Sequence, residues 1–199
     1  MPVMTSEPFV ISDRIRSLYD ISASDCSLAV WQRELPVDVT DLLDGDPEDL
    51  RITVSSHDPE APLRDALDKC GFPQGDTRQE LVEDMLTLCQ LFRDLTACPS
   101  IEVRLEVVTG DSCWKFHCDY VEMRLITTYH GRGTQWLDQR NADRLTDGLE
   151  PEVINELRTG DVGLFKGRLG NGLPAIHRSP PIDGTGEKRL LLVLNPVNG

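Results

Sequence analysis

The second half of the chain has a period-two pattern, and this feature limits the possible folds more than any other. From Ile101 onward, short apolar runs follow one another, separated by turns rich in glycine and proline. The runs are IEVRLEVV, VEMRLITTYH, GDVGLFKG, PAIHRSPP and KRLLLVLNP. Period two is the repeat of a β-strand, and glycine or proline suits the tight turns between strands. Several short strands with such turns predict a jelly roll or a small barrel rather than a parallel βαβ sheet.

The first half of the chain has a different character. Residues 1–100 mix helical and short strand-like pieces, separated by acidic loops that contain proline. The clearest helix covers residues 77–96, where apolar side chains recur every three or four positions and form one stripe that includes Cys89. Such a stripe is typical of a packing face, so we expect this helix to lie on the sheet and to bury Cys89. Two short candidate strands are Val30-Trp31 and residues 51–56.

The length of the chain predicts one domain rather than two, because 199 residues suffice for a single core. We expect an α+β protein with a double-stranded β-helix core of the jelly-roll or cupin-like kind. This metal-binding core would span residues 101–199, with the N-terminal mixed helical region, residues 1–100, packed against it. A short helix is expected at residues 141–157, within the strand-rich half.

The charge of the chain restricts its partners. The sequence has 34 acidic and 20 basic residues, a formal net charge of -14. A surface of this sign repels phosphate backbones, so nucleic acid is not expected as a partner. No apolar run is long enough to span a bilayer, and the first residues lack the pattern of a signal peptide, so we expect a cytoplasmic protein without a membrane partner. The six cysteines include no Cys-x-x-Cys pair, which predicts reduced thiols.

A histidine and an aspartate two residues apart are the main candidate site. His117 and Asp119 lie in the segment WKFHCDYVEMRL. In an extended chain successive side chains alternate between faces, so both can reach one divalent ion while Cys118 points away. With four histidines in an Asp-rich chain, this spacing alone is a weak signal. His177, in the strand-like AIHRSPP, is the natural third ligand.

Two histidines and one carboxylate leave half of an octahedron open, which suits non-heme Fe(II) that activates oxygen. The order of His117-x-Asp119, His177 and then Arg189 on late strands resembles the double-stranded β-helix of the Fe(II)/2-oxoglutarate-dependent oxygenases. More specifically, KFHCDYVEMRLITTYHGRGTQWL, FKG, HRSPP and RLLLVLN resemble the family called domain of unknown function 1826. That resemblance covers most of the chain and implies a fold and a site, but no substrate.

The resemblance to the oxygenases implies a role for each site residue. The two histidines and the aspartate would hold Fe(II), and 2-oxoglutarate would chelate the metal through its keto acid end. Arg189 would bind the far carboxylate, because a planar guanidinium offers two parallel hydrogen bonds. Arg124 is a second candidate for that anion, and Tyr129 could add its hydroxyl group. The implied activity is oxidation, in particular hydroxylation, of a small molecule or a polypeptide side chain.

The sequence leaves other interpretations open. If the chain turns sharply at residues 114–116, Cys113 and Cys118 could join the histidines around Zn(II) in a closed shell, because thiolates favour zinc. Such a protein would use zinc for structure, storage or sensing. A cupin-like metalloenzyme that does not use 2-oxoglutarate is another possibility, and a wholly structural role of the histidines, without metal, is a third. Neither the substrate nor the oligomeric state follows from the sequence.

Overall fold

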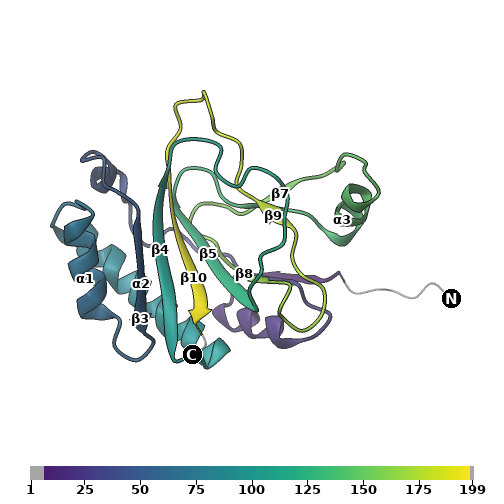
Figure 1. The fold of residues 1–199 in the computed structure, drawn as a ribbon, viewed down its shortest axis with the longest axis horizontal. Coiled ribbons are helices and arrows are strands. Elements are labelled where there is room, and N and C mark those ends of the chain that lie inside the picture. Colours follow the sequence, from purple (N-terminus) through teal and green to yellow (C-terminus); the bar gives the residue numbers. More distant parts are fainter. Residues whose placement is uncertain (1–6, 198–199) are drawn as a thin grey trace.

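The computed structural model describes residues 7–197, and Figure 1 shows their arrangement. This range forms ten strands, three α-helices and two 3-10 helices. In chain order the elements are β1 (Phe9–Ser12), η1 (Ile15–Ser22), β2 (Leu28–Trp31), η2 (Thr40–Leu43), β3 (Leu50–Ser55), α1 (Glu60–Lys69), α2 (Asp76–Thr96), β4 (Ser100–Val108), β5 (Met123–His130), β6 (Gln135–Trp136), α3 (Gln139–Thr146), β7 (Asn155–Glu156), β8 (Val162–Lys166), β9 (His177–Arg178) and β10 (Arg189–Val197).

Seven strands form one main sheet, in the order β1-β2-β8-β5-β10-β4-β3. Neighbouring strands are antiparallel, except that β1 and β2 run parallel. The nine residues of β10 pair with the whole of β4, from Arg189 opposite Val108 to Val197 opposite Ser100. The sequence of β10, RLLLVLNPV, is nearly continuous in apolar residues, as is typical of a strand that is covered on both faces.

A small second sheet, in the order β7-β6-β9, lies against one face of the main sheet (Figure 1). Trp136 of β6 and the neighbouring Leu157 share an apolar cluster with Ile126, Phe165 and Leu191 of the main sheet. Two mostly antiparallel sheets that face each other across such a cluster make a jelly roll, or double-stranded β-helix. This confirms the predicted fold class. We call this face of the main sheet the metal side, for the site described below.

The opposite face of the main sheet carries the helical layer, and we call it the helical side. The apolar stripe of α2 is buried there, through Leu81, Val82, Met85, Leu88, Cys89 and Phe92. This stripe shares one large cluster with alternate residues of the central strands, among them Val103 and Leu192. Burial raises the pKa of the Cys89 thiol to about 12. The predicted packing helix is confirmed, and Cys89 is a core residue.

The N-terminal half contributes more strand to the sheet than its sequence led us to expect. β1 and β2 extend the main sheet at one edge, and β3 forms the other edge. The candidate strand at Val30-Trp31 is confirmed as part of β2, and that at residues 51–56 is confirmed up to residue 55, where β3 ends. The expected helix at residues 141–157 ends sooner, at Thr146, because Gly148 adopts a left-handed φ of 77° that stops the helix. No described helix is long and apolar enough to cross a membrane.

Candidate metal centre

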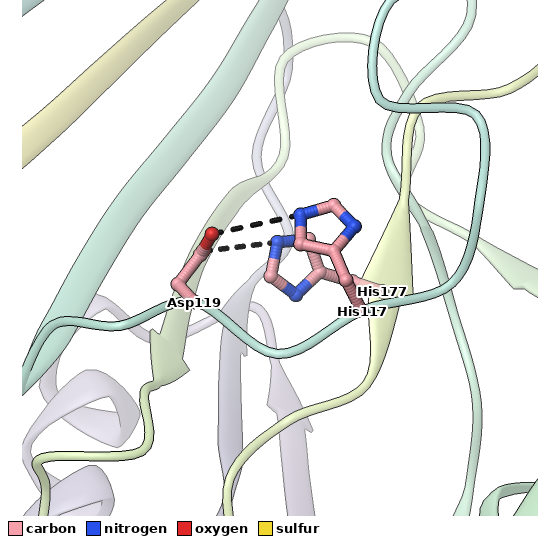
Figure 2. Close-up of side chains that lie close together, drawn as sticks. All are labelled: His117, Asp119 and His177. Carbon is pink, nitrogen blue, oxygen red and sulfur yellow. Dashed lines mark ion pairs between the residues drawn. The ribbon is translucent and has the colours of Figure 1, made fainter.

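Two histidines and an aspartate converge between the two sheets (Figure 2). His117 and Asp119 come from the connection between β4 and β5, and His177 is the first residue of β9. One ligand atom from each of the three residues lies within 4.8 Å of the others. The structure therefore brings together the three side chains that the sequence predicted as metal ligands.

Backbone pairing holds the two histidines side by side. The amide of His117 donates to the carbonyl of His177, and the amide of His177 donates to the carbonyl of His117, both at 3.0 Å. This isolated bridge continues the small sheet beyond β9. Residues directly opposite each other on paired strands present their side chains to the same face, and the two imidazole centroids lie 4.8 Å apart. The ring of His177 also packs against Phe165, with centroids 4.7 Å apart.

The backbone around each histidine also selects the nitrogen that is free to bind a metal. Nδ1 of His117 lies 2.8 Å from the carbonyl oxygen of Lys115, and Nδ1 of His177 lies 3.4 Å from that of Ala175. A carbonyl oxygen only accepts, so Nδ1 is the donor in each contact. On a neutral ring Nε2 then carries the lone pair, as in many metal-binding histidines. Both Nε2 atoms face Asp119.

The two oxygens of Asp119 have different surroundings. Oδ1 accepts a hydrogen bond from Arg124 at 2.6 Å and lies 3.5 Å from Nε2 of His117. Oδ2 lies 3.1 Å from Nε2 of His177, but outside hydrogen-bond geometry, and it accepts no hydrogen bond from the described residues. A buried carboxylate oxygen without a donor is costly unless another group binds it. Together with the two imidazole nitrogens, Oδ2 makes a donor set that fits a divalent metal ion.

The surroundings of Asp119 keep its carboxyl group ionised. Burial would raise the pKa of this group, but the contacts with both histidines and with Arg124 outweigh burial and hold that pKa well below its ordinary value. In return, the carboxylate of Asp119 raises the pKa of His117. Metal binding requires an ionised carboxylate and neutral imidazoles, so a divalent ion would compete with the proton on the histidines.

Arg124, predicted as a second clamp for the cofactor, lies beside the metal ligands. Its Nε donates to Oδ1 of Asn195 at 2.7 Å, and its Nη1 donates to Oδ1 of Asp119 at 2.6 Å. The guanidinium is thus fixed between Asn195 of β10 and Asp119. A role in binding the far carboxylate of 2-oxoglutarate stays a prediction, and the contacts of Arg124 indicate another role, which is developed below.

Tyr129 does not reach the site, and its predicted role in cofactor binding is wrong. Its side chain belongs to the core cluster on the helical side of the main sheet, together with Leu125 four positions earlier in β5. The hydroxyl group donates to Oδ2 of Asp84 on α2, at 2.6 Å. The alternation of side chains along β5 therefore places Tyr129 on the side of the sheet opposite the metal ligands.

Arg189 is fully buried at the start of β10 and is incompletely paired. Its Nε donates to the carbonyl of Arg132 at 2.6 Å, and its Nη1 donates to the hydroxyl of Ser179 at 3.0 Å. Its Nη2 has no partner among the described residues, and none of their carboxylates forms an ion pair with it. Burial lowers the pKa of this guanidinium to about 10. A buried cation with a free donor fits an anionic ligand.

Ser179 links Arg189 to the metal ligands. It follows His177 by two positions in extended chain, and its amide donates to the carbonyl of Cys113 at 3.0 Å. Side chains two positions apart in an extended chain share a face and lie about 7 Å apart. The serine that contacts Arg189 thus lies two positions along the chain from the candidate metal ligand His177.

The cysteines do not join the metal centre. Within residues 7–197, the cluster of candidate ligands contains the two histidines and Asp119, and neither Cys113 nor Cys118 is part of it. Cys113 is exposed, and all six cysteines are unpaired in this part of the chain. The arrangement of the described residues therefore gives no support to a closed shell of histidine and cysteine ligands around Zn(II), which stays an alternative.

An open cavity of about 910 Å³ lies elsewhere, beyond the turn that follows β5. Gly131, Arg132, Glu156, Arg158 and Lys188 are among the residues that line it. The three metal-ligand candidates and Arg189 are not among its lining residues, so this cavity is separate from the metal centre.

Sequence reasoning missed Ser179 and Asn195, the polar partners of the two arginines at the site. Ser179 directly follows β9, and Asn195 lies within β10, two residues before its end. One available signal was spacing, because Ser179 follows His177 by two positions and so shares its face. For Asn195 the signal was a buried asparagine in an otherwise apolar strand, which needs a hydrogen-bond partner.

The fold and this site define the class of the protein: a jelly roll with a His-x-Asp and distal His cluster between its two sheets. The chain belongs to the family described as Protein of unknown function (DUF1826), whose model matches residues 12–195. This confirms the family to which the sequence was predicted to belong. No curated protein matches the sequence significantly.

Several solved structures resemble the chain at low sequence identity. A prolyl-4-hydroxylase of Pseudomonas putida is 12% identical, with a TM-score of 0.49, over 94% of this chain and 100% of that one. The non-heme alpha ketoglutarate dependent epimerase SnoN from nogalamycin biosynthesis is 16% identical, with a TM-score of 0.38, over 75% and 62%. HygX of Streptomyces hygroscopicus, solved with iron bound, is 15% identical, with a TM-score of 0.36, over 79% and 87%. At these identities the likeness concerns the fold alone.

Proposed function

We propose that this protein is a non-heme Fe(II)- and 2-oxoglutarate-dependent oxygenase that hydroxylates a small molecule or a polypeptide side chain. The observation that carries the proposal is the convergence of two imidazole Nε2 atoms and one unpartnered carboxylate oxygen between the sheets of a jelly roll. Two histidines and one carboxylate leave coordination positions open, an arrangement typical of non-heme Fe(II) oxygenases. A structural zinc site would have a fourth protein ligand, which the described residues do not supply.

The buried guanidinium of Arg189 supports the choice of 2-oxoglutarate as the cosubstrate. This ligand carries two carboxylates, so one end can bind the metal while the other meets Arg189. The free Nη2 and the neighbouring hydroxyl of Ser179 would then both donate to the far carboxylate. An anion there would also supply the negative charge that the buried arginine lacks in the protein alone.

The residues of the chain would bind and orient the reactants. Fe(II) and 2-oxoglutarate, when bound together, supply the activation of dioxygen for the oxidation of a substrate C–H bond. His177 has a buried side chain, whereas 35% of the His117 side chain is exposed. The metal centre therefore opens to solvent on the side of His117, and we expect the substrate to approach from that side.

The proposal is tested by adding Fe(II) and 2-oxoglutarate to the purified protein without oxygen. The wild type is expected to bind one metal ion per chain and to develop a metal-to-ligand charge-transfer band. On exposure to oxygen it should form succinate, even without the substrate, through slow uncoupled turnover. His177→Ala should lose the metal, the band and the succinate. His57→Ala, which changes an exposed histidine outside the site, is the matched control and should retain all three.

Two results would reject the function. A wild type that binds Fe(II) but shows neither the band nor succinate would be a metalloprotein that does not use 2-oxoglutarate. A wild type that prefers Zn(II) strongly in a competition experiment, and forms no succinate with Fe(II), would return the site to the zinc-binding alternative.

A further inference from the structure

A continuous series of polar contacts runs along one face of the main sheet, from strand to strand, and ends on the proposed metal ligand Asp119. Nδ2 of Asn195 donates to Glu102 on β4 at 2.7 Å, and Oδ1 of the same Asn195 accepts from Nε of Arg124 at 2.7 Å. Nη1 of Arg124 then donates to Oδ1 of Asp119 at 2.6 Å. The series thus connects three neighbouring strands, β4, β10 and β5, with the connection that carries Asp119.

Each member of this series has few other orientations. Asn195 is 5% exposed, and both ends of its amide are used, so the contacts on its two sides fix which end faces Arg124. Arg124 is held through two different nitrogens of one planar group, which fixes the plane of the guanidinium and not only its position. The direction from which Arg124 meets Asp119 is therefore set by the sheet.

The consequence lies in how the oxygens of Asp119 are divided. Arg124 occupies Oδ1, while Oδ2, which faces His177, accepts no hydrogen bond from the described residues. A buried ion pair with a purely structural role can satisfy both oxygens of the carboxylate, as Arg33 does for Asp84. Here one oxygen is fixed and the other is left for a ligand.

We propose that Arg124, oriented by Asn195 and through it by Glu102, is a positioning residue that makes Asp119 bind the metal through Oδ2 alone. A carboxylate that binds through one oxygen occupies one coordination position rather than two, which leaves more positions for ligands other than the protein. The inference deepens the proposed function, because those positions are the ones that 2-oxoglutarate and dioxygen would need.

The choice of variants follows from the charge of Arg124. Removal of that charge has two opposite effects on metal affinity. The cation repels a nearby metal ion, so its loss strengthens binding, but it also orients the ligand Asp119, so its loss weakens binding. Arg124→Gln would therefore mix the two. Arg124→Lys and Asn195→Ala keep the charge and remove the orientation. Arg104→Lys is the matched control, since Arg104 lies on the same side of the sheet, on β4 beyond β10, and pairs with Glu106 rather than with Asp119.

The experiment is an anaerobic titration of the full chain with Co(II) and with Fe(II), without 2-oxoglutarate. Arg124→Lys and Asn195→Ala are expected to bind both metals about 10- to 100-fold more weakly than the wild type, the usual cost of removing a partner that orients a metal ligand. The d–d absorption of bound Co(II), which reports coordination number and geometry, should shift in both variants. Arg104→Lys should match the wild type in affinity and in spectrum.

The outcomes separate this inference from the proposed function. Unchanged affinity and an unchanged Co(II) spectrum in both variants would overturn the positioning role, even if their stability fell, because a merely structural contact affects unfolding only. A wild type that binds metal but forms no succinate would reject the oxygenase and leave the role of Arg124 standing. A wild type that binds neither metal would reject both.

Discussion

Two buried arginines on opposite sides of the main sheet differ in how completely they are paired. Arg33, on the helical side, gives both terminal nitrogens to Asp84 at 2.5 and 2.8 Å, and its Nε to the carbonyl of Gly160 at 2.8 Å. Arg189, on the metal side, contacts only neutral acceptors and keeps Nη2 without a partner among the described residues. Only 9% of the Arg33 side chain is exposed, and Arg189 is fully buried.

The pKa values of the two guanidinium groups move in opposite directions. Burial lowers the pKa of both, but the pair with Asp84 outweighs burial and raises the pKa of Arg33. The more distant charges of Glu156 and Glu106 raise the pKa of Arg189, but burial outweighs them and lowers it to about 10. The buried charge of Arg33 on the helical side is thus neutralised by the protein itself. The metal side would be completed by a cation at Asp119 and an anion at Arg189.

The largest effect on stability is expected where the buried pair is complete. Asp84→Ala leaves Arg33 as an unpaired buried charge and removes the acceptor of Tyr129. Loss of one partner of a buried ion pair costs about 3–5 kcal/mol, so the free energy of unfolding should fall by this amount in urea denaturation. Metal affinity of the folded protein should not change, because Asp84 lies on the other side of the sheet.

The matched control for this prediction is an exposed ion pair. Glu152→Ala breaks its contacts with Arg140 and Arg144. The side chains of Glu152, Arg140 and Arg144 are 47%, 76% and 30% exposed, so the loss should cost less than about 1 kcal/mol. If Asp84→Ala costs no more than Glu152→Ala, the pair of Arg33 and Asp84 is not the support that its geometry indicates.

The second effect concerns ligand binding at Arg189, the incompletely paired arginine. Arg189→Met keeps the bulk of the side chain and removes the charge. We expect the affinity for 2-oxoglutarate, measured through the charge-transfer band of the Fe(II) protein, to fall by about 10- to 150-fold, the equivalent of about 1.5–3 kcal/mol for hydrogen bonds to a charged group. The free energy of unfolding should be unchanged or higher, because an unpaired buried charge is removed.

Arg33→Met provides the contrast. The same substitution on the helical side leaves the buried Asp84 without its charged partner and should destabilise the protein strongly. Equal losses of stability in Arg189→Met and Arg33→Met, with unchanged affinity for 2-oxoglutarate in Arg189→Met, would show that Arg189 is a structural residue.

The fold was largely predictable from the second half of the sequence. Alternation of side chains is a local property of a strand, so the five runs from Ile101 onward are found in β4, β5, β8, β9 and β10. The pairing of strands is not local. β1 and β3 lie at opposite edges of one sheet because β1 pairs with β2, which itself pairs with the distant β8, while β3 pairs with β4. No pattern within these short strands specifies those partners.

The site was predictable where its signal was local. His117 and Asp119 are two positions apart, so both side chains can face the same way, and the strand context of His177 pointed to the third side chain that the structure brings into the same cluster. The error at Tyr129 has a simple physical cause. One position along a strand separates one face from the other, and the neighbouring Thr128 pairs with Leu191 of the metal-side cluster while Tyr129 faces α2.

A third and smaller effect distinguishes the two sides by pH. Burial, and then the charge of Asp84, raise the pKa of Tyr129 well above its ordinary value. A folded-state pKa above the unfolded value means that the neutral hydroxyl contributes its full stability below about pH 10, and that this contribution is lost as the pH rises further. Tyr129→Phe should lower the free energy of unfolding by about 1–2 kcal/mol at pH 8, through the loss of the hydrogen bond to Asp84.

The difference between the two proteins should then shrink above pH 10. Denaturation curves of the wild type and of Tyr129→Phe, recorded at intervals from pH 8 to the alkaline limit of the fold, measure it directly. A constant difference over this range would mean that Tyr129 ionises in the folded protein as easily as in the unfolded chain.

The smallest effect is expected at the two cysteines nearest the metal ligands in sequence. Cys113 is exposed and Cys118 is half-buried, and neither belongs to the ligand cluster. Cys113→Ser and Cys118→Ser should therefore keep one metal ion per chain, leave its affinity unchanged, and alter the free energy of unfolding by no more than about 0.5 kcal/mol. Elemental analysis after reconstitution with Fe(II) and Zn(II) in competition measures the first two. Loss of metal in either variant would mean that a thiolate is a ligand. Because thiolates favour zinc, the unpaired charges on the metal side would then belong to a zinc protein rather than to an oxygenase.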